Sequence, residues 1–244
     1  MSGENHGGAD LPSLREDLIM ALRREGALKP SGEVEAAIRS VPREEFIWPG
    51  TPKFTAYFDE PQPLGSTGQT ISAPHIVALM LEELELSPGL KVLEIGGGSG
   101  YNAALIGHIV SARSKETAPQ EPLVISVERG HELAEFAKAN LMRVGLAGVV
   151  RVIEGDGSLG YPQQSCEELY DRIVVAAGAP RVPIYLRRQL KVGGIMIIPI
   201  GGINYQKLTK ITKKEGARPG AVEFHSREII DCMFVPLVGS DAHS

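Results

Sequence analysis

The sequence has little cysteine, no long apolar run and no excess of basic residues. Its two cysteines, Cys166 and Cys232, lie far apart and match no metal-ligand spacing, which indicates unpaired thiols in a reducing cytoplasm. No apolar run approaches the roughly 20 residues that cross a bilayer, and the polar, acidic residues 1–10 do not resemble a secretory signal. A net charge of −5 argues against nucleic-acid binding, because phosphate neutralisation needs a basic surface. We therefore expect a cytoplasmic protein with no nucleic-acid or membrane partner.

The length and composition indicate one globular domain. The 244 residues, of which 43% are hydrophobic and 23% charged, are enough to bury a full core. Residues 1–12 are Gly-rich and polar, which predicts a disordered N-terminal tail. We expect a single domain at 13–238 and a short C-terminal tail at 239–244.

Two helices and a long loop are predicted before residue 70. Apolar residues at helical spacing predict a helix from Leu14 to Leu28. Ser31 suits the N-cap of a second helix that ends near Ser40. The segment from Trp48 to Gly68 is rich in proline and glycine, which predicts a long structured loop. Long loops in compact domains are usually functional or disordered. Because this one carries Phe54, Tyr57 and Phe58, we expect it to be ordered and functional.

From Ala73 onward, predicted helices and strands alternate. We expect helices at 76–86, 101–110, 131–145 and 183–190, and strands at 90–95, 123–128, 149–154, 171–176 and 194–200. This succession is typical of a doubly wound α/β fold, with a mostly parallel sheet and right-handed crossovers. After Gly201 the helical pattern stops, and 208–212 with 222–237 predict an antiparallel C-terminal section. Residues 111–122 are polar and contain proline, so we expect a surface insertion there.

A glycine-rich turn joins the first predicted strand to the next helix, in the segment VLEIGGGSGY (92–101). Glycines let the backbone turn sharply and approach a ligand closely. The dinucleotide-binding pattern needs a third glycine where Tyr101 stands, and no residue pair suited to hydride transfer is evident, which disfavours an oxidoreductase. S-adenosyl-L-methionine carries an ammonium and a sulfonium, which favour a nearby acid such as Glu94. The turn therefore favours a methyltransferase.

Acids follow the next two predicted strands. Glu128 ends the second strand, where a carboxylate can accept hydrogen bonds from ribose hydroxyls in either nucleotide class. Asp156, followed by Gly157, comes after the third strand and could accept from an adenine amino group, although Asp-Gly is also a favoured turn pair. In register with Glu94 and the glycines, these acids predict a cofactor site.

A second candidate site lies upstream, in the segment GSTGQTISAPH (65–75). Ser72 suits the N-cap of the helix that follows, with Pro74 in its first turn. The free N–H groups and positive dipole end of that helix can also hold a carboxylate, and the hydroxyls of Thr70 and Ser72 lie beside it in sequence. Both interpretations can hold together.

Several segments together resemble the protein-L-isoaspartate O-methyltransferase family. In the family's order they are VPREEF (41–46), AYFDEP (56–61), GQTISAPH (68–75), VLEIGGGSGY (92–101), VISVERGHELAEFAKANL (124–141), EGDG (154–157), YDRIVVAAGAP (170–180), LKVGGIMIIPIG (190–201) and FVPL (234–237). The resemblance covers roughly 14–238. It implies methyl transfer from S-adenosyl-L-methionine, with S-adenosyl-L-homocysteine as product and no metal. The implied acceptor is the free carboxylate of L-isoaspartyl residues in damaged peptides and proteins, which is repaired through a succinimide.

The resemblance also implies roles for individual residues. The implied catalytic residues are Ser72 and Thr70. The implied cofactor-binding residues are Gln69, Ile71, Glu94, Gly96, Gly98, Ser99, Glu128, Arg129, Asp156 and Gly157. The implied substrate-binding residues are Gly68, Val235, Pro236, Leu237 and Val238. Within the domain, 13–72 would then supply the N-terminal helices and substrate loop, and 73–238 the cofactor-binding sheet.

The expected chemistry needs no general base, because a carboxylate with a pKa near ~4 is ionised at neutral pH. The enzyme would align the reacting atoms and exclude water from the nucleophile. The loop 64–69 is one residue longer than the family's spacing, which affects substrate geometry more than cofactor binding. The alternatives are a related carboxyl methyltransferase acting on another peptide or a biosynthetic intermediate, and a cofactor-binding protein without catalysis. We expect a monomer.

Overall fold

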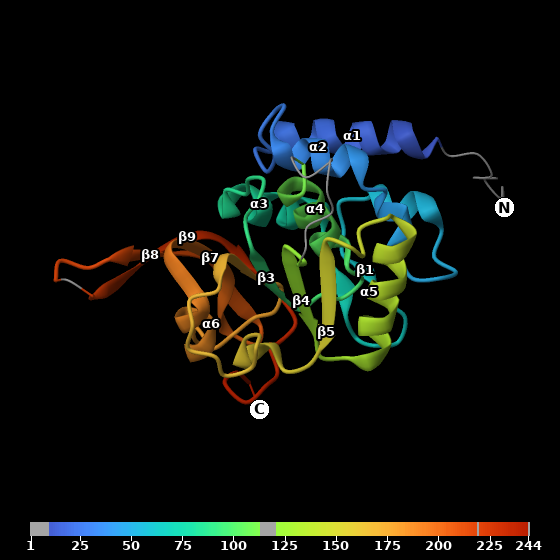
Figure 1. The fold of residues 1–244 in the computed structure, drawn as a ribbon. Coiled ribbons are helices and arrows are strands. Elements are labelled where there is room, and N and C mark those ends of the chain that lie inside the picture. The colour runs from blue at the N-terminus through green and yellow to red at the C-terminus, as the bar shows by residue number, and fades with distance from the viewer. Residues whose placement is uncertain (1–9, 113–120, 219, 244) are drawn as a thin grey trace.

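The computed structural model describes residues 10–112, 121–218 and 220–243 (Figure 1). In chain order its elements are α1 (Leu11–Arg24), α2 (Glu33–Ser40), η1 (Arg43–Glu45), η2 (Lys53–Tyr57), β1 (Gln62–Pro63), β2 (Thr70–Ile71), α3 (Pro74–Leu84), β3 (Val92–Ile95), α4 (Tyr101–Val110), β4 (Val124–Glu128), α5 (His131–Arg143), β5 (Val150–Glu154), η3 (Gly157–Leu159), β6 (Tyr170–Val175), α6 (Ile184–Gln189), β7 (Leu190–Gly202), β8 (Tyr205–Glu215) and β9 (Val222–Cys232), where η denotes a 3₁₀ helix. The predicted insertion at 111–122 and the predicted disorder at 1–12 lie mostly outside the described residues.

Seven strands form one sheet in the order β5-β4-β3-β6-β7-β8-β9. The strands from β5 to β7 are parallel, and the two hairpin pairs formed by β7, β8 and β9 are antiparallel. The chain runs outward from β3 to β4 and β5, then returns to β6 on the other side of β3. Such a reversal is a topological switch point, where open α/β sheets bind ligands beyond the carboxyl ends of the strands. The predicted doubly wound fold with an antiparallel C-terminal section is confirmed.

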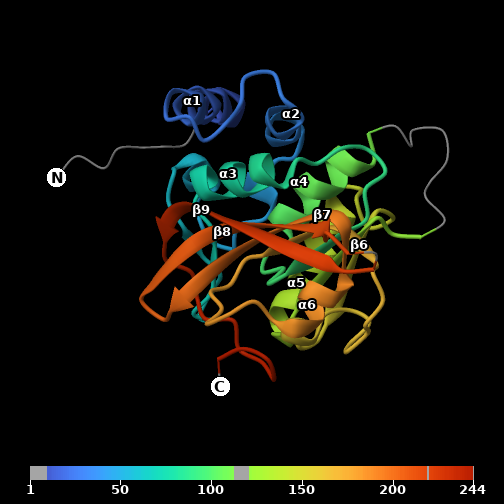
Figure 2. The same ribbon diagram turned by 90° about the vertical axis from the view of Figure 1, so that its left-hand side faces the viewer.

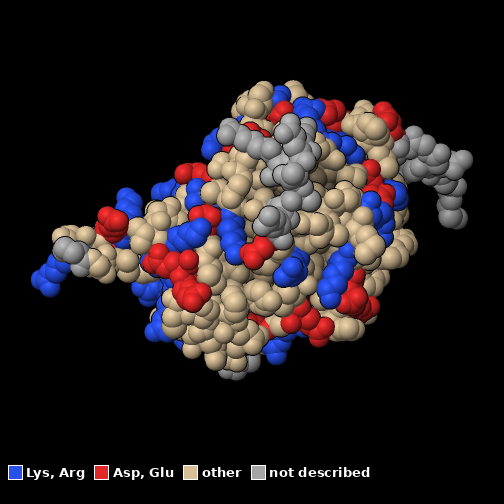
Figure 3. All heavy atoms as spheres, in the orientation of Figure 1, with Lys and Arg blue, Asp and Glu red and all other residues tan. Residues whose placement is uncertain are grey.

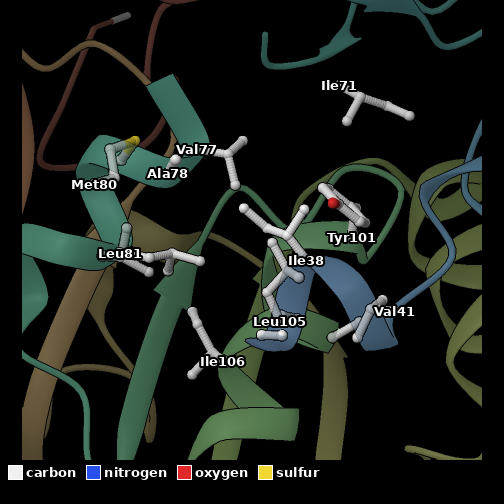
Figure 4. Close-up of a cluster of buried hydrophobic side chains, with 14 of the residues drawn as sticks. Ile38, Val41, Ile71, Val77, Ala78, Met80, Leu81, Tyr101, Leu105 and Ile106 are labelled. Carbon is white, nitrogen blue, oxygen red and sulfur yellow. The ribbon is translucent and has the colours of Figure 1, made fainter. Parts of the chain in front are cut away.

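Two hydrophobic clusters cover the two faces of the sheet. Successive strand residues point to opposite faces, so Val92 belongs to one cluster and Leu93 to the other. Buried side chains of α1 to α5 join the first cluster, and Leu186 of α6 joins the second. Figure 4 shows part of the first cluster, which gathers side chains from α2, α3 and α4, including Ile38, Val77, Leu81 and Leu105. Burial of each such side chain stabilises the fold by about 1.5–3 kcal/mol.

The N-terminal helices form an additional layer. In both ribbon views, α1 and α2 lie on the outer side of α3 and α4, away from the sheet (Figures 1 and 2). The chain then passes through η1, η2 and the short β1–β2 ribbon before it enters α3. The predicted long loop from Trp48 to Gly68 therefore contains η2 and β1. This path brings the end of the loop, at Leu64, next to Gly98 in the turn that follows the carboxyl end of β3.

The helix boundaries differ from prediction at the N-terminus. The helix predicted at Leu14–Leu28 begins at Leu11, within the predicted tail, and ends at Arg24. Ser31 is not an N-cap: it has φ 58°, and α2 starts two residues later with Gly32 at its N-cap. The backbone N–H of Ser31 donates instead to the Glu35 carboxylate at 3.2 Å. The Glu35 side chain thus reaches back to the residue before the N-cap, and no side chain caps the first N–H groups of α2.

The surface carries charges of both signs. On the face drawn in Figure 3, Lys and Arg side chains are interspersed with Asp and Glu rather than gathered in a stripe. Within the described ranges, none of the helices has the combination of length and apolar character needed to cross a bilayer.

Candidate active site

A cavity lies at the switch point, beyond the carboxyl ends of β3 and β4. Its wall is formed by the β1–β2 ribbon and α3, the turn after β3, the strand ends and the C-terminal segment. The lining residues are Gln69, Thr70, Ile71, Ser72, Val77, Met80, Ile95, Gly96, Gly97, Gly98, Ser99, Tyr101, Asn102, Val127, Glu128, Arg129, Gly155, Gly157, Ala176, Ala177, Val235, Pro236, Leu237 and Val238.

The glycine turn after β3 packs directly against β4. Gly96, Gly98 and Gly100 have φ of 87°, 52° and 83°, a region that only glycine adopts without strain. Gly97 has no space for a side chain, since a Cβ there would lie 2.5 Å from Ser126 Oγ. The turn therefore exposes backbone rather than side chains to the cavity, as predicted from the sequence.

Glu128 links this turn to the end of β4. One carboxylate oxygen accepts from the Gly98 N–H at 2.8 Å, and the other accepts from the Gly130 N–H at 2.9 Å. The side chain is buried at the cavity wall. Because each carboxylate oxygen has two lone pairs, both can still accept hydrogen bonds from a ligand. The structure thus holds Glu128 in place before any ligand binds.

Glu94 lies beneath the cavity rather than in its wall. It is fully buried on β3 and accepts hydrogen bonds from Ser126 Oγ and, at 2.8 Å, from Asn102 Nδ2. Burial raises the pKa of Glu94 to about 7, against the two hydrogen bonds that lower it, and the charge of Glu128 adds to the increase. The acid predicted to attract a cationic ligand is therefore buried behind the cavity wall and does not line the cavity.

Asp156 does not line the cavity either, although Gly155 and Gly157 on both sides of it do. Its carboxylate accepts from the N–H and hydroxyl of Ser158 and from the N–H of Ser240 at 2.8 Å. Burial acts to raise the pKa of Asp156, but these hydrogen bonds outweigh it and hold the pKa below its ordinary value. Residues 239–243, predicted as a tail, thus fold back onto the end of β5.

The segment with Thr70 and Ser72 reaches the cavity by way of β2, which pairs with β1. The prediction that Ser72 caps the next helix is wrong: α3 begins at Pro74 with Ala73 at its N-cap and no side-chain cap. Instead, the Asp59 carboxylate accepts from the His75 backbone N–H at 2.9 Å and contacts the His75 ring. Asp59 thus supplies the carboxylate at this helix N-terminus, where the sequence predicted that a carboxylate could be held. The Ser72 hydroxyl is not used as a cap.

Arg43 fixes the backbone of this segment and was not identified from the sequence. Its buried guanidinium donates to the carbonyls of Ala56 and Ser72, each at 2.9 Å, and lies over the Tyr101 ring at 4.8 Å. Burial lowers its pKa. One arginine therefore ties the loop, the Thr-Ile-Ser segment and α4 together. Arg43 belongs to the VPREEF segment, but only its burial shows what it does.

Most of the residues predicted for the site line one cavity. The exceptions are Gly68, Glu94 and Asp156. Lining residues that sequence reasoning missed include Met80, Tyr101 and Asn102. Among the described residues, no group of three or more His, Cys, Asp or Glu side chains could hold a metal ion.

This fold and site define a class of protein. A doubly wound sheet with a glycine turn after β3 and an acid at the end of β4 is the arrangement of an S-adenosyl-L-methionine-dependent methyltransferase. Residues 13–242 match the model of the protein-L-isoaspartate(D-aspartate) O-methyltransferase family. The chain belongs to this family.

Similar proteins carry the same family name. The protein-L-isoaspartate O-methyltransferase of Staphylothermus marinus is 48% identical over 225 residues, covering 92% of this chain and 94% of that protein. That of Hyperthermus butylicus is 49% identical, covering 92% and 88%. A Plasmodium falciparum crystal structure described under this name, in complex with S-adenosyl-L-homocysteine, has a TM-score of 0.76 at 27% identity, covering 95% of this chain and 99% of that one.

Proposed function

We propose that the protein transfers a methyl group from S-adenosyl-L-methionine to the free carboxylate of L-isoaspartyl residues in damaged peptides and proteins. The methyl ester then cyclises to a succinimide, which begins repair. The observation that carries the proposal is that Gln69 to Ser72 and the glycine turn share one cavity. A segment that can hold a carboxylate thus lies against a segment that can hold the methyl donor. The names of the relatives at 48% and 49% identity support the same substrate.

The residues of the cavity fit this cofactor. The backbone of Gly96 to Gly98 leaves room for close approach, and Glu128 has lone pairs for ribose hydroxyls. Gly155 and Gly157 line the wall after β5, where the absence of side chains leaves room for a planar ring. The buried Glu94, on β3 directly before the glycine turn, suits the cationic end. When bound, the cofactor supplies an electrophilic methyl group.

Ser72 and Thr70 would orient the substrate carboxylate. The hydroxyls of both residues make no hydrogen bond to another described residue, so both can donate to a ligand. Arg43 holds the Ser72 backbone through its carbonyl, which fixes the position of the hydroxyl. Val235 to Val238 also line the cavity and supply apolar side chains that would limit hydration of the carboxylate. Alignment and desolvation then suffice, because the nucleophile is already ionised.

The test uses two matched peptides, one with L-isoaspartate and one with normal aspartate, and labelled S-adenosyl-L-methionine. We expect base-labile label on the isoaspartyl peptide only. Ser72→Ala should lower the rate by about tenfold or more, the value of one hydrogen bond to a charged group. Ser66→Ala is the matched control, because it makes the same change in the same loop at an exposed position outside the cavity.

Two results would contradict the proposal. Cofactor binding without transfer to either peptide would favour another carboxylate substrate, peptide or biosynthetic, or a non-catalytic role. Equal transfer to both peptides would exclude selection of isoaspartate. If Ser72→Ala and Ser66→Ala reacted at equal rates, the proposed reaction would stand, but the Ser72 hydroxyl would have no role in it.

We also infer that residues 13–238 act as one catalytic unit. Leu64 and Ile71, from the predicted substrate loop, belong to the same buried cluster as α3 and α4 of the cofactor-binding part, which supports this inference. A cytoplasmic location and a monomeric state stay predictions from the sequence.

A further inference from the structure

Phe58 is an exposed aromatic side chain directly after η2. The structure describes all six phenylalanines, and Phe58 is the only exposed one, with 44% of its surface accessible. The ring of Phe54, in η2, meets it edge to face, with ring centres 5.7 Å apart. The two rings thus form one aromatic surface on the loop. An exposed aromatic surface of this kind is typical of sites that bind a partner.

The loop holds Phe58 in a fixed position. On one side, Tyr57 is buried and the Ala56 carbonyl accepts from the guanidinium of Arg43 at 2.9 Å. On the other side, the Asp59 carboxylate accepts from a backbone N–H in the first turn of α3 at 2.9 Å. A side chain that is already fixed loses little conformational entropy when it binds, which favours affinity. The exposure of Phe58 therefore does not come from a loosely attached loop.

This aromatic surface lies beside the segment that carries Ser72. One buried guanidinium donates to the carbonyls of Ala56 and Ser72, each at 2.9 Å. Three residues further along each segment, the Asp59 carboxylate accepts from the His75 N–H. The two segments therefore run side by side in the same direction. Phe58 is only two residues from Ala56, at most about 7 Å of chain, so it lies close to the cavity wall at Ser72.

We propose that Phe58, supported by Phe54, binds an apolar side chain of the substrate polypeptide close to the isoaspartyl residue. The proposal rests on the proposed function, in which the substrate carboxylate is held at Ser72. An extended chain advances about 3.3 Å per residue, so a residue two or three positions from the isoaspartate lies roughly 7–10 Å from it. Because the two segments run side by side, such a residue can reach Phe58. Phe58 lies outside the cavity that would hold the cofactor, so the substrate chain is the partner placed to cover it.

The proposal defines a class of substrate. Apolar side chains beside an isoaspartate belong mostly to segments that are buried in folded proteins. Such segments reach an enzyme only when the damaged protein has unfolded at least locally. The aromatic surface would therefore favour damage in unfolded chains over damage in polar surface loops.

The test measures methylation of isoaspartyl peptides with a glycine and serine background. One leucine is placed in turn at each of three positions on either side of the isoaspartate. For the wild type we expect a position at which leucine lowers KM by about fivefold, because leucine and Phe58 bury apolar surface together, with kcat changed by less than about twofold. Phe58→Ser should abolish this preference and leave the KM of the leucine-free peptide unchanged.

Two further variants complete the test. Phe58→Leu keeps an apolar side chain and should retain most of the preference. Met142→Ser, at an exposed position on α5 outside the cavity, is the matched control and should behave like the wild type.

Three outcomes would overturn the proposal. If leucine changes KM at none of the six positions, the enzyme has no apolar subsite beside the isoaspartate. A preference that persists in Phe58→Ser would place the subsite elsewhere, and if this variant does not fold, persistence in Phe58→Gln carries the same meaning. Equal loss of activity toward all peptides in Phe58→Ser would mean that Phe58 only supports the loop. Failure of the wild type to methylate any isoaspartyl peptide would instead overturn the proposed function itself, which distinguishes that result from the other three.

Discussion

Replacing Glu94 by glutamine should change how stability depends on pH. Burial raises the pKa of Glu94 in the folded chain from 4.5 to about 7. Between these values the folded state binds more protons than the unfolded state, so stability falls as pH rises. Each pKa unit corresponds to about 1.4 kcal/mol, so the wild type loses roughly 3 kcal/mol across the whole window. Glu94→Gln removes the titration, and its amide can accept from Asn102 and donate to Ser126.

The measurement is thermal or chemical unfolding of both proteins, without ligand, from about pH 4 to pH 8. The stability of the wild type relative to Glu94→Gln should be highest at the acidic end and should decline through pH 7. For a domain of this size, roughly 3 kcal/mol corresponds to a Tm difference of about 6–12 °C. Glu132→Gln, on the exposed first turn of α5, makes the same substitution away from the cavity. A difference curve for Glu94→Gln that is flat with pH would refute the assignment of a raised pKa to this buried acid.

Two further predictions concern the wall of the cavity and the C-terminal segment. Gly157→Ala should destabilise the protein by about 1–3 kcal/mol, because its Cβ would collide with Ile95, whereas Gly155→Ala should cost less than about 0.5 kcal/mol, since its Cβ meets only the end of a flexible glutamine. Equal unfolding temperatures for these two variants would contradict the packing argument. Asp241→Ala removes hydrogen bonds from the Arg181 guanidinium and the first N–H of α6, and should cost about 0.5–2 kcal/mol in thermal unfolding. Proteolysis near the C-terminus should also become faster, and an unchanged cleavage rate would show that these bonds do not hold the segment.

The alternation of apolar strands and amphipathic helices was enough to predict the architecture. The strand predicted at 123–128 is Val124–Glu128, and that predicted at 149–154 is Val150–Glu154. Agreement was poorer in the hairpins: the strand predicted at 194–200 extends from Leu190 to Gly202. At its start, Leu190 pairs in parallel with Tyr170 of β6, and at its end antiparallel pairing with β8 continues to Gly202. Backbone pairing of this kind leaves no apolar pattern that would predict it.

The location of the site was also predictable, because carboxyl ends of parallel strands meet at one edge of the sheet. Glycines and acids just after the strands therefore had to face a common space. What the sequence did not reveal are contacts between side chains far apart along the chain. Arg43 reaches the carbonyl of Ser72, 29 residues on, and Asp59 takes the N-terminus of α3, 16 residues on. A motif locates such residues but gives neither their partners nor their burial.

Asp156 illustrates how a correct location can conceal a different contact. The sequence placed an acid after β5 beside the adenine position, and the chain does turn there into the cavity wall at Gly155 and Gly157. The carboxylate itself faces Ser158 and the N–H of Ser240, so it anchors the segment that directly follows Val238. Because that segment begins where the apolar wall of the cavity ends, loss of the Asp156 carboxylate would act on both the adenine side and the substrate side. Residues 239–243 are therefore held against the turn after β5, directly beside the unit inferred for 13–238.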